Sequence, residues 1–519
     1  MSYLELLKLA SPEAIITVTA LAVLAIGLTG GRGFVAAAVS AAKPTADVGD
    51  TPATSAPASG ICCFVATLGL ALAAGAVLML PQHTTLFRGM VVITPLNSLF
   101  KVICIALAFF TVLLARSDRS SRNHGEYLAL VLLATIGLML LIGSEELLMI
   151  FIGLELTGLS LYVMTAFDKT DLRSAEAGLK YFLFGSTASA FTLFGLSFIY
   201  GMSGTTGLAA IGQKLTTASL QPLLAVGIVM TLVGFAFKIA AAPFHLWAPD
   251  AYQGAPVPSA AFIASGSKVA SFVVLGKIVL VGFGPVHGSA AWHAMVGGWS
   301  PVLAALAALS ILIGNLVALA QSNVRRLLAY SAVAHTGYTL LGLVAGGRDG
   351  FSATLFYTTV YAFTLVGAFG VVALVRRETG GDDLTNFSAL WSRSPLLAGC
   401  MSIFMLSLAG LPPLAGFFGK FYLFSAALRA GANHGLLWLV ALALFGSLIS
   451  LYYYLVVLKV IFVAPALSEV EWVDELSTKV PTIKLELLQR VSLSVLAALV
   501  LFLGIAPAPL VSRIIASFP

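Results

Sequence analysis

The sequence predicts an all-α integral membrane protein with about fourteen transmembrane helices. The chain has 519 residues, of which 59% are hydrophobic and only 10% are charged, and its mean hydropathy is +1.00. This composition leaves too little polar surface to cover a soluble domain of that size. Apolar segments of about 20 residues recur along nearly the whole chain, which is the length that a helix needs to cross a hydrocarbon core. A barrel would require alternating polarity, and none is visible.

The predicted spans are the apolar segments that lie between polar breaks. Their centres fall near residues 20, 70, 106, 134, 157, 188, 232, 270, 310, 335, 363, 410, 447 and 500. The even number of spans places both ends of the chain on the same side of the membrane. Loops on one side are rich in lysine and arginine, with Arg116, Arg119, Arg122, Lys169, Arg173, Arg325, Arg326, Arg376, Arg377, Arg393, Lys479, Lys484 and Arg490. The opposite loops hold chiefly Arg88, Lys214, Arg348 and Arg429. By the positive-inside tendency, both termini are therefore expected outside the cytoplasm.

Two connections stand out from the apolar spans. Residues 1–124 are expected to form an N-terminal three-helix region, with a flexible loop over 31–60 that is rich in Gly, Ala, Ser, Thr and Pro. The N-terminus has no basic leader and carries Glu5 and Glu13 before its apolar run, so it is expected to be a retained helix. Residues 464–519 are expected to form a polar surface connection and the last helix.

An internal repeat divides the remaining chain into two inverted halves. The text "AFTLFG" at Ala190 recurs as "AFTLVG" at Ala362, five spans later, and an odd offset turns the second copy upside down. The bounds of these halves, residues 125–284 (helices 4 to 8) and 298–463 (helices 9 to 13), are what the family resemblance described below implies, and they agree with the repeated text. Each has one proline-broken span with a lysine beside the break. These are Lys238 with Pro243, and Lys420 with Gly410, Pro412, Pro413 and Gly416.

Ionisable residues inside the spans are the candidate functional groups. They are Glu155, Lys180, Lys238, Lys268, His335 and Lys420. Each charge near a helix centre costs about 2.5 to 3.5 kcal/mol on insertion, so a functional reason for keeping them is expected. Structural alternatives stay open for three residues. Lys180 could pair with Glu176 at the end of its helix, His335 could be a satisfied core histidine, and Lys277 lies close enough to a span end to reach outward.

The opposite charges of Glu155 and Lys238 suggest a switchable proton carrier. A buried lysine beside a carboxylate can hold or release a proton as that carboxylate moves, whereas arginine is effectively never deprotonated. A broken helix also exposes backbone groups that need water or polar side chains. We therefore expect Lys238 to hold a proton and the break from Pro243 to Pro249 to let water and His245 pass it onward. A kinked helix with a merely paired lysine is the alternative.

Other kinds of site find little support in the sequence. The four cysteines, Cys62, Cys63, Cys104 and Cys400, lie in or beside apolar runs without metal-type spacing and are interpreted as packing residues. Haem ligation, a Walker A loop and a dinucleotide fingerprint are not indicated. The net charge of +6 is small for this length, so no nucleic-acid partner is expected. An ion gradient or a partner protein must therefore supply the energy.

Four segments carry a resemblance to a known family. They read "KIAAAPFHLWAPDAYQGAPVPSAAFIASGSKVASF", "LVALAQSNVRRLLAYSAVAHTGYTLLGLVAG", "LAGLPPLAGFFGKFYLF" and "SAEAGLKYFLFGSTASAFTLFG". They closely resemble the subunit N family of bacterial NADH:quinone oxidoreductase, respiratory complex I, one of the antiporter-like families related to Mrp cation/proton antiporters. The resemblance is strong over roughly residues 125–460. The run "PDAYQGAPVP", a lysine at position 420 and the absence of a long lateral helix favour subunit N over subunits L and M. The linker at 31–60 is longer than the family pattern.

The resemblance implies roles for the embedded residues. Glu155 and Lys238 match the central Glu/Lys pair and Lys180 its partner on the sixth helix. Lys268 matches the bridging lysine, Lys420 the terminal lysine, and His245 and His335 the connecting histidines.

The resemblance also implies a function and a setting. The chain would be a proton-translocating subunit of the membrane arm in a bacterial inner membrane, with both termini periplasmic. It would carry no cofactor and no redox chemistry, because NAD, FMN, iron–sulfur clusters and quinone would bind to other subunits. Its expected partners are subunit M, the small subunits K and J, and the lipid bilayer. A subunit of an Mrp-type cation/proton antiporter is the main alternative, and a pure scaffold would leave the buried charges unexplained.

Overall fold

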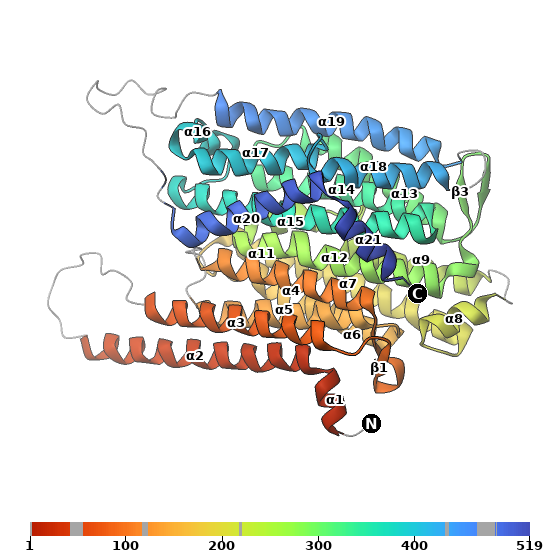
Figure 1. Cartoon of the computed structure of the whole chain (residues 1–519), viewed down its shortest axis with the longest axis horizontal. Coiled ribbons are helices and arrows are strands. Elements are labelled where there is room, and N and C mark those ends of the chain that lie inside the picture. Colours follow the sequence, from red (N-terminus) through yellow and green to blue (C-terminus); the bar gives the residue numbers. More distant parts are fainter. Residues whose placement is uncertain are drawn as a thin grey trace.

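The protein is a bundle of long helices that run side by side (Figure 1). The computed structural model describes residues 3–41, 56–116, 123–216, 221–430, 435–463, 483 and 485–518. Both termini lie toward one end of the bundle, on the right in Figure 1, together with two short hairpins and α8 (Leu208–Leu215). We call this end the terminal end. We call the opposite end the basic end, because the arginine-rich turns lie there.

Twelve helices in the described part of the chain are long and apolar enough to cross a membrane, and two shorter apolar helices accompany them. The unbroken long helices are α2 (Ser11–Ala41), α3 (Ala56–Met79), α4 (Pro95–Ala115), α5 (His124–Gly143), α6 (Leu147–Thr165), α7 (Leu172–Ser203), α13 (Trp299–Ala318), α14 (Val324–Ala345), α15 (Gly347–Thr379), α19 (Leu437–Phe462) and α20 (Leu487–Ile505). The twelfth span is composite and consists of α11 (Val257–Phe262), η2 (Ile263–Ser267), α12 (Lys268–Lys277) and η3 (Ile278–Gly282). The multi-pass all-α fold is therefore confirmed.

The two shorter helices belong to broken spans. Helix α9 (Pro222–Lys238) is followed by α10 (Trp247–Gly254), and α17 (Pro395–Ala409) is followed by α18 (Ala415–Arg429). With these two included, a helix or a helix break lies at each of the fourteen predicted centres.

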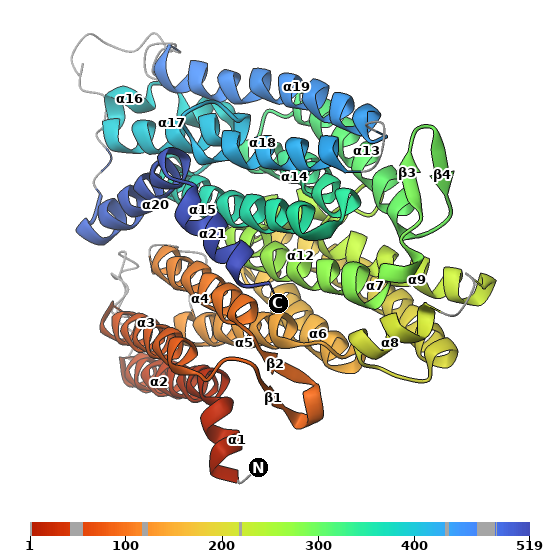
Figure 2. The same cartoon turned by 45° about the vertical axis from the view of Figure 1, so that its right-hand side comes forward.

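Short elements cap the ends of the bundle. They are α1 (Tyr3–Leu9), β1 (Thr84–Leu86), η1 (Phe87–Gly89), β2 (Val91–Ile93), η4 (Gly284–Val286), β3 (Ser289–Ala291), β4 (Ala294–Val296), η5 (Leu384–Phe387), α16 (Leu390–Arg393) and α21 (Ala508–Ala516). The strands form two antiparallel hairpins, β1 with β2 and β3 with β4 (Figure 2).

The two inverted halves share one order of elements. Counting from α5 and from α13, the third helix is the longest of its half, with 32 residues in α7 and 33 in α15. The fourth span of each half is the broken one. The repeated text at Ala190 and Ala362 falls in these two third helices, so the sequence echo marks equivalent elements of the two halves.

Each break has local causes and local partners. Ala240 has a positive φ of 56° and Pro243 follows it, so α9 cannot continue. The indole nitrogen of Trp247 donates to the carbonyl of Phe237 at 3.1 Å, and the Ala242 amide donates to the Ser310 hydroxyl at 2.8 Å. Backbone groups freed by the break are thus satisfied inside the bundle. In the second half, Gly410 at φ 86° ends α17 ahead of two prolines.

Close helix contacts use small residues, as is typical in membranes. A Cβ atom built on Gly125 would lie 2.6 Å from the Cα atom of Gly27, so α2 packs directly against α5 only because both residues are glycines. Between α5 and α6, a Cβ atom on Gly137 would lie 2.5 Å from the Thr157 hydroxyl. The first contact packs the N-terminal helices against the first half, and the second packs two helices within that half.

The predicted loop over 31–60 is wrong in extent. Helix α2 continues to Ala41 and α3 already begins at Ala56. The alanines that were read as linker composition are the best helix formers, which accounts for the longer helices. Residues 42–55 lie outside the described residues, as do 464–482 and 484 of the predicted surface connection. The four cysteines are buried and form no disulfide, in agreement with a packing role.

Candidate functional site

A row of ionisable side chains, partly buried at Glu155 and buried from Lys238 onward, crosses the bundle between the two broken spans. It starts at Glu155 in the middle of α6 and Lys238 at the last turn of α9. It continues with Lys268 at the junction of η2 and α12, His335 in the middle of α14, and Lys420 in α18. The exposed fractions are 8% for Lys238 and 2 to 4% for Lys268, His335 and Lys420. All these residues come from sequence-predicted positions.

Glu155 and Lys238 face one small cavity but do not form an ion pair within the described residues. Glu155 accepts a hydrogen bond from the Ser189 hydroxyl at 2.5 Å, and Lys238 Nζ donates to the Leu154 carbonyl at 3.3 Å. Both side chains line the same cavity, with Ser189, Thr192 and Tyr162 among its walls. Its volume of about 10 Å³ is close to the least that one water molecule needs. The pair is therefore adjacent, with room for a bridging water.

Lys268 links the first half to the second. Its Nζ atom donates to the Ala332 carbonyl at 2.7 Å and to the Thr336 hydroxyl at 2.9 Å, both on α14. The Thr336 hydroxyl in turn lies 2.7 Å from the carbonyl of Ile239, the residue after Lys238. A single threonine thus connects the lysine of one span to the broken end of another.

His335 is held between two phenols. Its Nδ1 atom lies 2.5 Å from the Tyr357 hydroxyl, and its Nε2 atom lies 3.0 Å from the Tyr454 hydroxyl. The Tyr454 hydroxyl also contacts the Ser331 hydroxyl. A neutral imidazole donates from one nitrogen and accepts at the other, so a proton arriving at one nitrogen can leave from the other. The arrangement satisfies the buried histidine and also makes it a possible relay.

Lys420 closes the row in the second half. Its Nζ atom donates to the Ala409 carbonyl at 2.9 Å and to the Ser447 hydroxyl at 2.8 Å. Ala409 is the last residue of α17, so this lysine satisfies a carbonyl freed by the second helix break. The break and the buried charge therefore stabilise one another.

Tyrosines next to the lysines are the residues that the sequence reasoning missed. The Nζ atom of Lys238 lies 5.9 Å from the ring centre of Tyr162, that of Lys268 lies 5.5 Å from Tyr361, and that of Lys420 lies 5.2 Å from Tyr338. These distances suit cation–π attraction. The His335 ring packs against both Tyr361 and Tyr338, which bridge it to Lys268 and Lys420. Tyr338 could have been found from its position three residues after His335 on one helix.

Lys180 lies apart from the row, toward the basic end. It forms ion pairs with Glu176 at 2.6 Å and with Asp250 at 2.9 Å, and its side chain is 40% exposed. The pair with Glu176 is the structural alternative that the sequence left open. Asp250 also binds Arg326 at 2.7 Å. Burial raises the pKa of Asp250, but its hydrogen bonds from Lys180 and Arg326 outweigh this effect, so the pKa lies below its ordinary value.

His245 lies in the first break and is 5% exposed. Its Nδ1 atom is buried and has no hydrogen-bond partner in the described part of the chain. Its ring centre lies 6.2 Å from that of Tyr330. A buried polar atom without a partner is costly and is expected to meet a water molecule or to become paired in another state.

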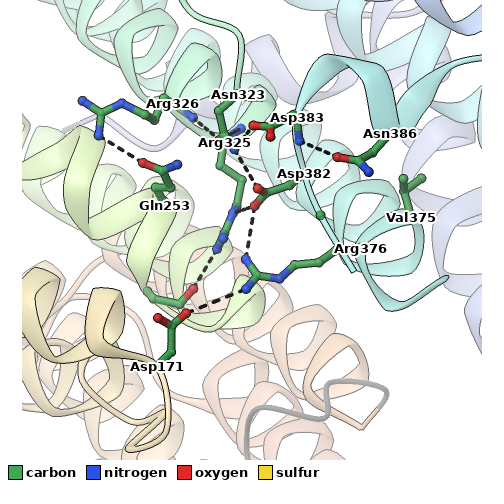
Figure 3. A network of polar contacts seen from close by, with 12 residues as sticks. Asp171, Gln253, Asn323, Arg325, Arg326, Val375, Arg376, Asp382, Asp383 and Asn386 are labelled. Carbon is green, nitrogen blue, oxygen red and sulfur yellow. Dashed lines mark hydrogen bonds and ion pairs between the residues drawn. The ribbon is translucent and has the colours of Figure 1, made fainter. Parts of the chain in front are cut away.

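A second polar network joins the two halves at the basic end (Figure 3). Asp382 accepts hydrogen bonds from the buried Arg325, from Arg376 at 3.2 Å and from the Asn323 amide at 2.7 Å. Arg325 also donates to the Ala255 carbonyl of the first half at 2.8 Å, and Arg376 lies 4.0 Å from Asp171. These arginines of the basic end therefore connect the two halves.

The fold and the site define a class of protein. This is a multi-pass helical membrane protein with two inverted halves, in which each half has a broken span and a buried lysine beside the break. Among the described residues, no group of three His, Cys, Asp or Glu side chains could hold a metal ion.

The chain belongs to the NADH:quinone oxidoreductase/Mrp antiporter transmembrane family, whose model matches residues 144–450. It is 44% identical over 519 residues to NADH-quinone oxidoreductase subunit N 2 of Acidobacterium capsulatum, covering 98% of each chain. It is 41% identical over 391 residues to NADH-quinone oxidoreductase subunit N of Trichlorobacter lovleyi, covering 74% of this chain and 78% of the relative. The resemblance to subunit N is thus confirmed.

Solved structures agree with these relatives. A chain of respiratory complex I from Thermus thermophilus with bound aureothin is 31% identical, with a TM-score of 0.76 over 98% of this chain and 100% of that chain. A chain of the Mrp complex from Dietzia sp. DQ12-45-1b is 21% identical, with a TM-score of 0.77 over 97% of this chain and 96% of that chain. The second likeness concerns the fold alone.

Proposed function

We propose that this chain is a proton-translocating subunit of the membrane arm of NADH:quinone oxidoreductase, respiratory complex I. The observation that carries the proposal is the row of three buried lysines, Lys238, Lys268 and Lys420, which lies between the two helix breaks. Thr336 joins Lys268 to the backbone next to Lys238, and the His335 ring with its tyrosine neighbours lies between Lys268 and Lys420. Its relatives bear the name of subunit N of this enzyme. The redox reaction would take place in other subunits, which would bind NAD, FMN, iron–sulfur clusters and quinone.

The transported ion is the proton. The ammonium form of a buried lysine repels a metal cation, but it can release a proton, and the resulting amine can take one up again. Glu155 would set the charge next to Lys238, and movement of Glu155 would change how readily Lys238 holds its proton. Lys268 and His335 would pass the proton to Lys420. Lys180 would modulate the first half through Asp250, and His245 would contact water in the first break.

The setting follows from the same proposal. The chain would lie in a bacterial inner membrane, with its basic end toward the cytoplasm and both termini on the periplasmic side. Its neighbours in the complex would be subunit M and the small subunits K and J. Signals from these neighbours would act on the row as charge changes at its ends, and the coupling would be reciprocal.

Purification from native membranes tests the proposal directly. A tagged full-length chain is expected to bring with it NADH:quinone oxidoreductase activity, and the purified complex should pump protons into liposomes when NADH and quinone are added. An uncoupler provides the control, because it should abolish the pH gradient without stopping NADH oxidation. A complex that instead exchanges Na⁺ or K⁺ for protons and has no NADH oxidation would favour the antiporter alternative and contradict ours.

Removal of one phenol next to His335 should slow the relay. Tyr454→Phe takes away the hydroxyl that lies 3.0 Å from His335 Nε2, so proton uptake by the assembled complex should fall about tenfold. The effect is smaller than the loss of a whole proton-transfer group, because the Tyr357 hydroxyl remains on the other ring nitrogen. Tyr127→Phe is the matched control, because it also removes a buried phenol that contacts a serine hydroxyl, Ser259 at 2.7 Å, but lies outside the row. Equal rates for the two variants would argue against a relay through Tyr454.

A further inference from the structure

Two more lysines are buried outside the central row, near the terminal end. Lys101 on α4 is 4% exposed and Lys277 at the end of α12 is 5% exposed. The structure therefore corrects the expectation that Lys277 reaches outward, because its side chain points into the bundle and not to the surface. Each buried lysine is costly unless it is paired. Their partners differ, and the difference indicates distinct roles.

Lys101 is a conventional buried ion pair. Its Nζ atom lies 2.6 Å from the carboxylate of Glu13, which is 14% exposed at the start of α2. This short charge-assisted contact ties the start of α2 to α4. Such a pair has a structural role.

Lys277 is held mainly by neutral acceptors. Its Nζ atom donates to the Asn97 side-chain oxygen at 2.6 Å and to the Ile142 carbonyl at 2.8 Å. The nearest carboxylate, Glu145, is 3.7 Å away and 40% exposed, in the turn between α5 and α6. The positive charge of Lys101 also acts on Lys277. Lys277 is thus a buried lysine with a loose carboxylate partner that reaches the surface.

The backbone around Lys277 matches that around Lys268. Lys268 directly follows the π-helical turn η2, and Lys277 directly precedes the π-helical turn η3. Such turns are rare and occur frequently at functional sites. The two lysines are nine residues apart on α12, a rise of about 14 Å, with the buried Ser271 hydroxyl between them. Helix α12 therefore carries one lysine at the centre of the row and a second one closer to the terminal end.

We infer that Lys277, Asn97 and Glu145 form a proton site through which the row exchanges protons with the terminal-end surface. The inference rests on the proposed function and adds a branch to it. In the step, one N–H bond of the Lys277 ammonium breaks and an O–H bond forms on Glu145, so that ammonium and carboxylate become amine and carboxylic acid. The gap of 3.7 Å is closed by one bridging water or by a side-chain rotation. Glu145 then releases the proton to solvent, and a proton from Lys268 restores the charge on Lys277.

A fixed charge at position 277 tests the inference. Lys277→Arg keeps the positive charge next to Glu145 and Lys101, but an arginine does not release its proton. In the assembled complex we expect proton pumping per NADH to fall about tenfold. Lys101→Arg is the matched control, because it keeps a tight pair with Glu13, and it should pump within twofold of the unaltered complex. Unchanged pumping by Lys277→Arg, or an equal loss in both variants, overturns the inference.

Glu145→Gln tests the inference independently if the complex that carries Lys277→Arg does not assemble. Glu145 is partly exposed, so the substitution should leave assembly intact while it removes the proton acceptor. We expect at least about a threefold loss of pumping, because the substitution leaves Lys277 without the carboxylate that receives its proton. Pumping within twofold of the unaltered complex at every pH overturns the inference. Such a result leaves the proposed function standing, because that function depends on Lys238 and not on Glu145.

Discussion

Lys238→Ala is expected to abolish proton pumping by the assembled complex, with a drop of about 100-fold or more in proton transfer. Lys238 is the last residue of α9 and is buried. Glu155 faces it across a cavity with room for about one water molecule. Without this side chain, the row loses the one lysine at the end of α9 and with it the group that takes up and releases the proton in the proposed function. The measurement is NADH-driven acidification in liposomes, with the amount of assembled complex determined in parallel.

Two further variants make this test specific. Lys238→Arg keeps a positive charge but cannot release a proton, so it should also fail to pump, which separates proton release from charge alone. Lys459→Ala removes an exposed lysine at the end of α19 and should pump normally. Full pumping by a complex with alanine at position 238 would refute the role of the row and with it the proposed function.

Asp382→Ala is expected to cause the largest loss of stability, about 3 to 5 kcal/mol in the free energy of unfolding. The carboxylate is 7% exposed and accepts hydrogen bonds from Arg325, Arg376 and Asn323. Its removal leaves the buried guanidinium of Arg325 without its anion, and an unpaired buried charge is far more costly than an absent pair. Unfolding of the purified chain in mixed detergent micelles, followed by tryptophan fluorescence, measures the change.

The neighbouring residue supplies a matched control. Asp383 is exposed, accepts one hydrogen bond from Asn323 at 2.9 Å and caps the short helix η5. Asp383→Ala should therefore cost only about 1 kcal/mol, the usual value of a helix cap. Similar losses for the two substitutions would show that Asp382 does not hold the halves together.

Several features of the fold and site were predictable from local sequence. The sequence clearly shows spans about 20 residues long, prolines inside apolar runs and isolated charges at mid-span. These features stand out because each charged or unpaired polar group in the hydrocarbon core raises the free energy of insertion. The echo at Ala190 and Ala362 correctly indicated inverted halves. The ends of α2 and α3 were less predictable, because alanine suits both a linker and a helix.

Other features depend on residues that are distant in sequence. Tyr162, Tyr338 and Tyr361 each reach a lysine from a different helix. Of the three, Tyr338 shares its helix with another member of the row, His335. The sequence around Lys277 does not indicate whether its side chain points toward the surface or into the bundle. Its hydrogen-bond acceptors belong to residues 97 and 142, which are distant in sequence. The Thr336 contact with Ile239 likewise joins two different halves.

The sequence by itself determined the membrane fold, the two inverted halves and the identity of the buried charges, because insertion into lipid acts on each segment separately and rewards apolar length. Tertiary structure alone decided which hydroxyls, rings and carbonyls surround each lysine, and therefore which lysine is tightly paired and which is loosely held. The physical reason is that the cost of a buried charge depends on partners within a few ångströms, and helix packing brings these partners together from distant parts of the chain.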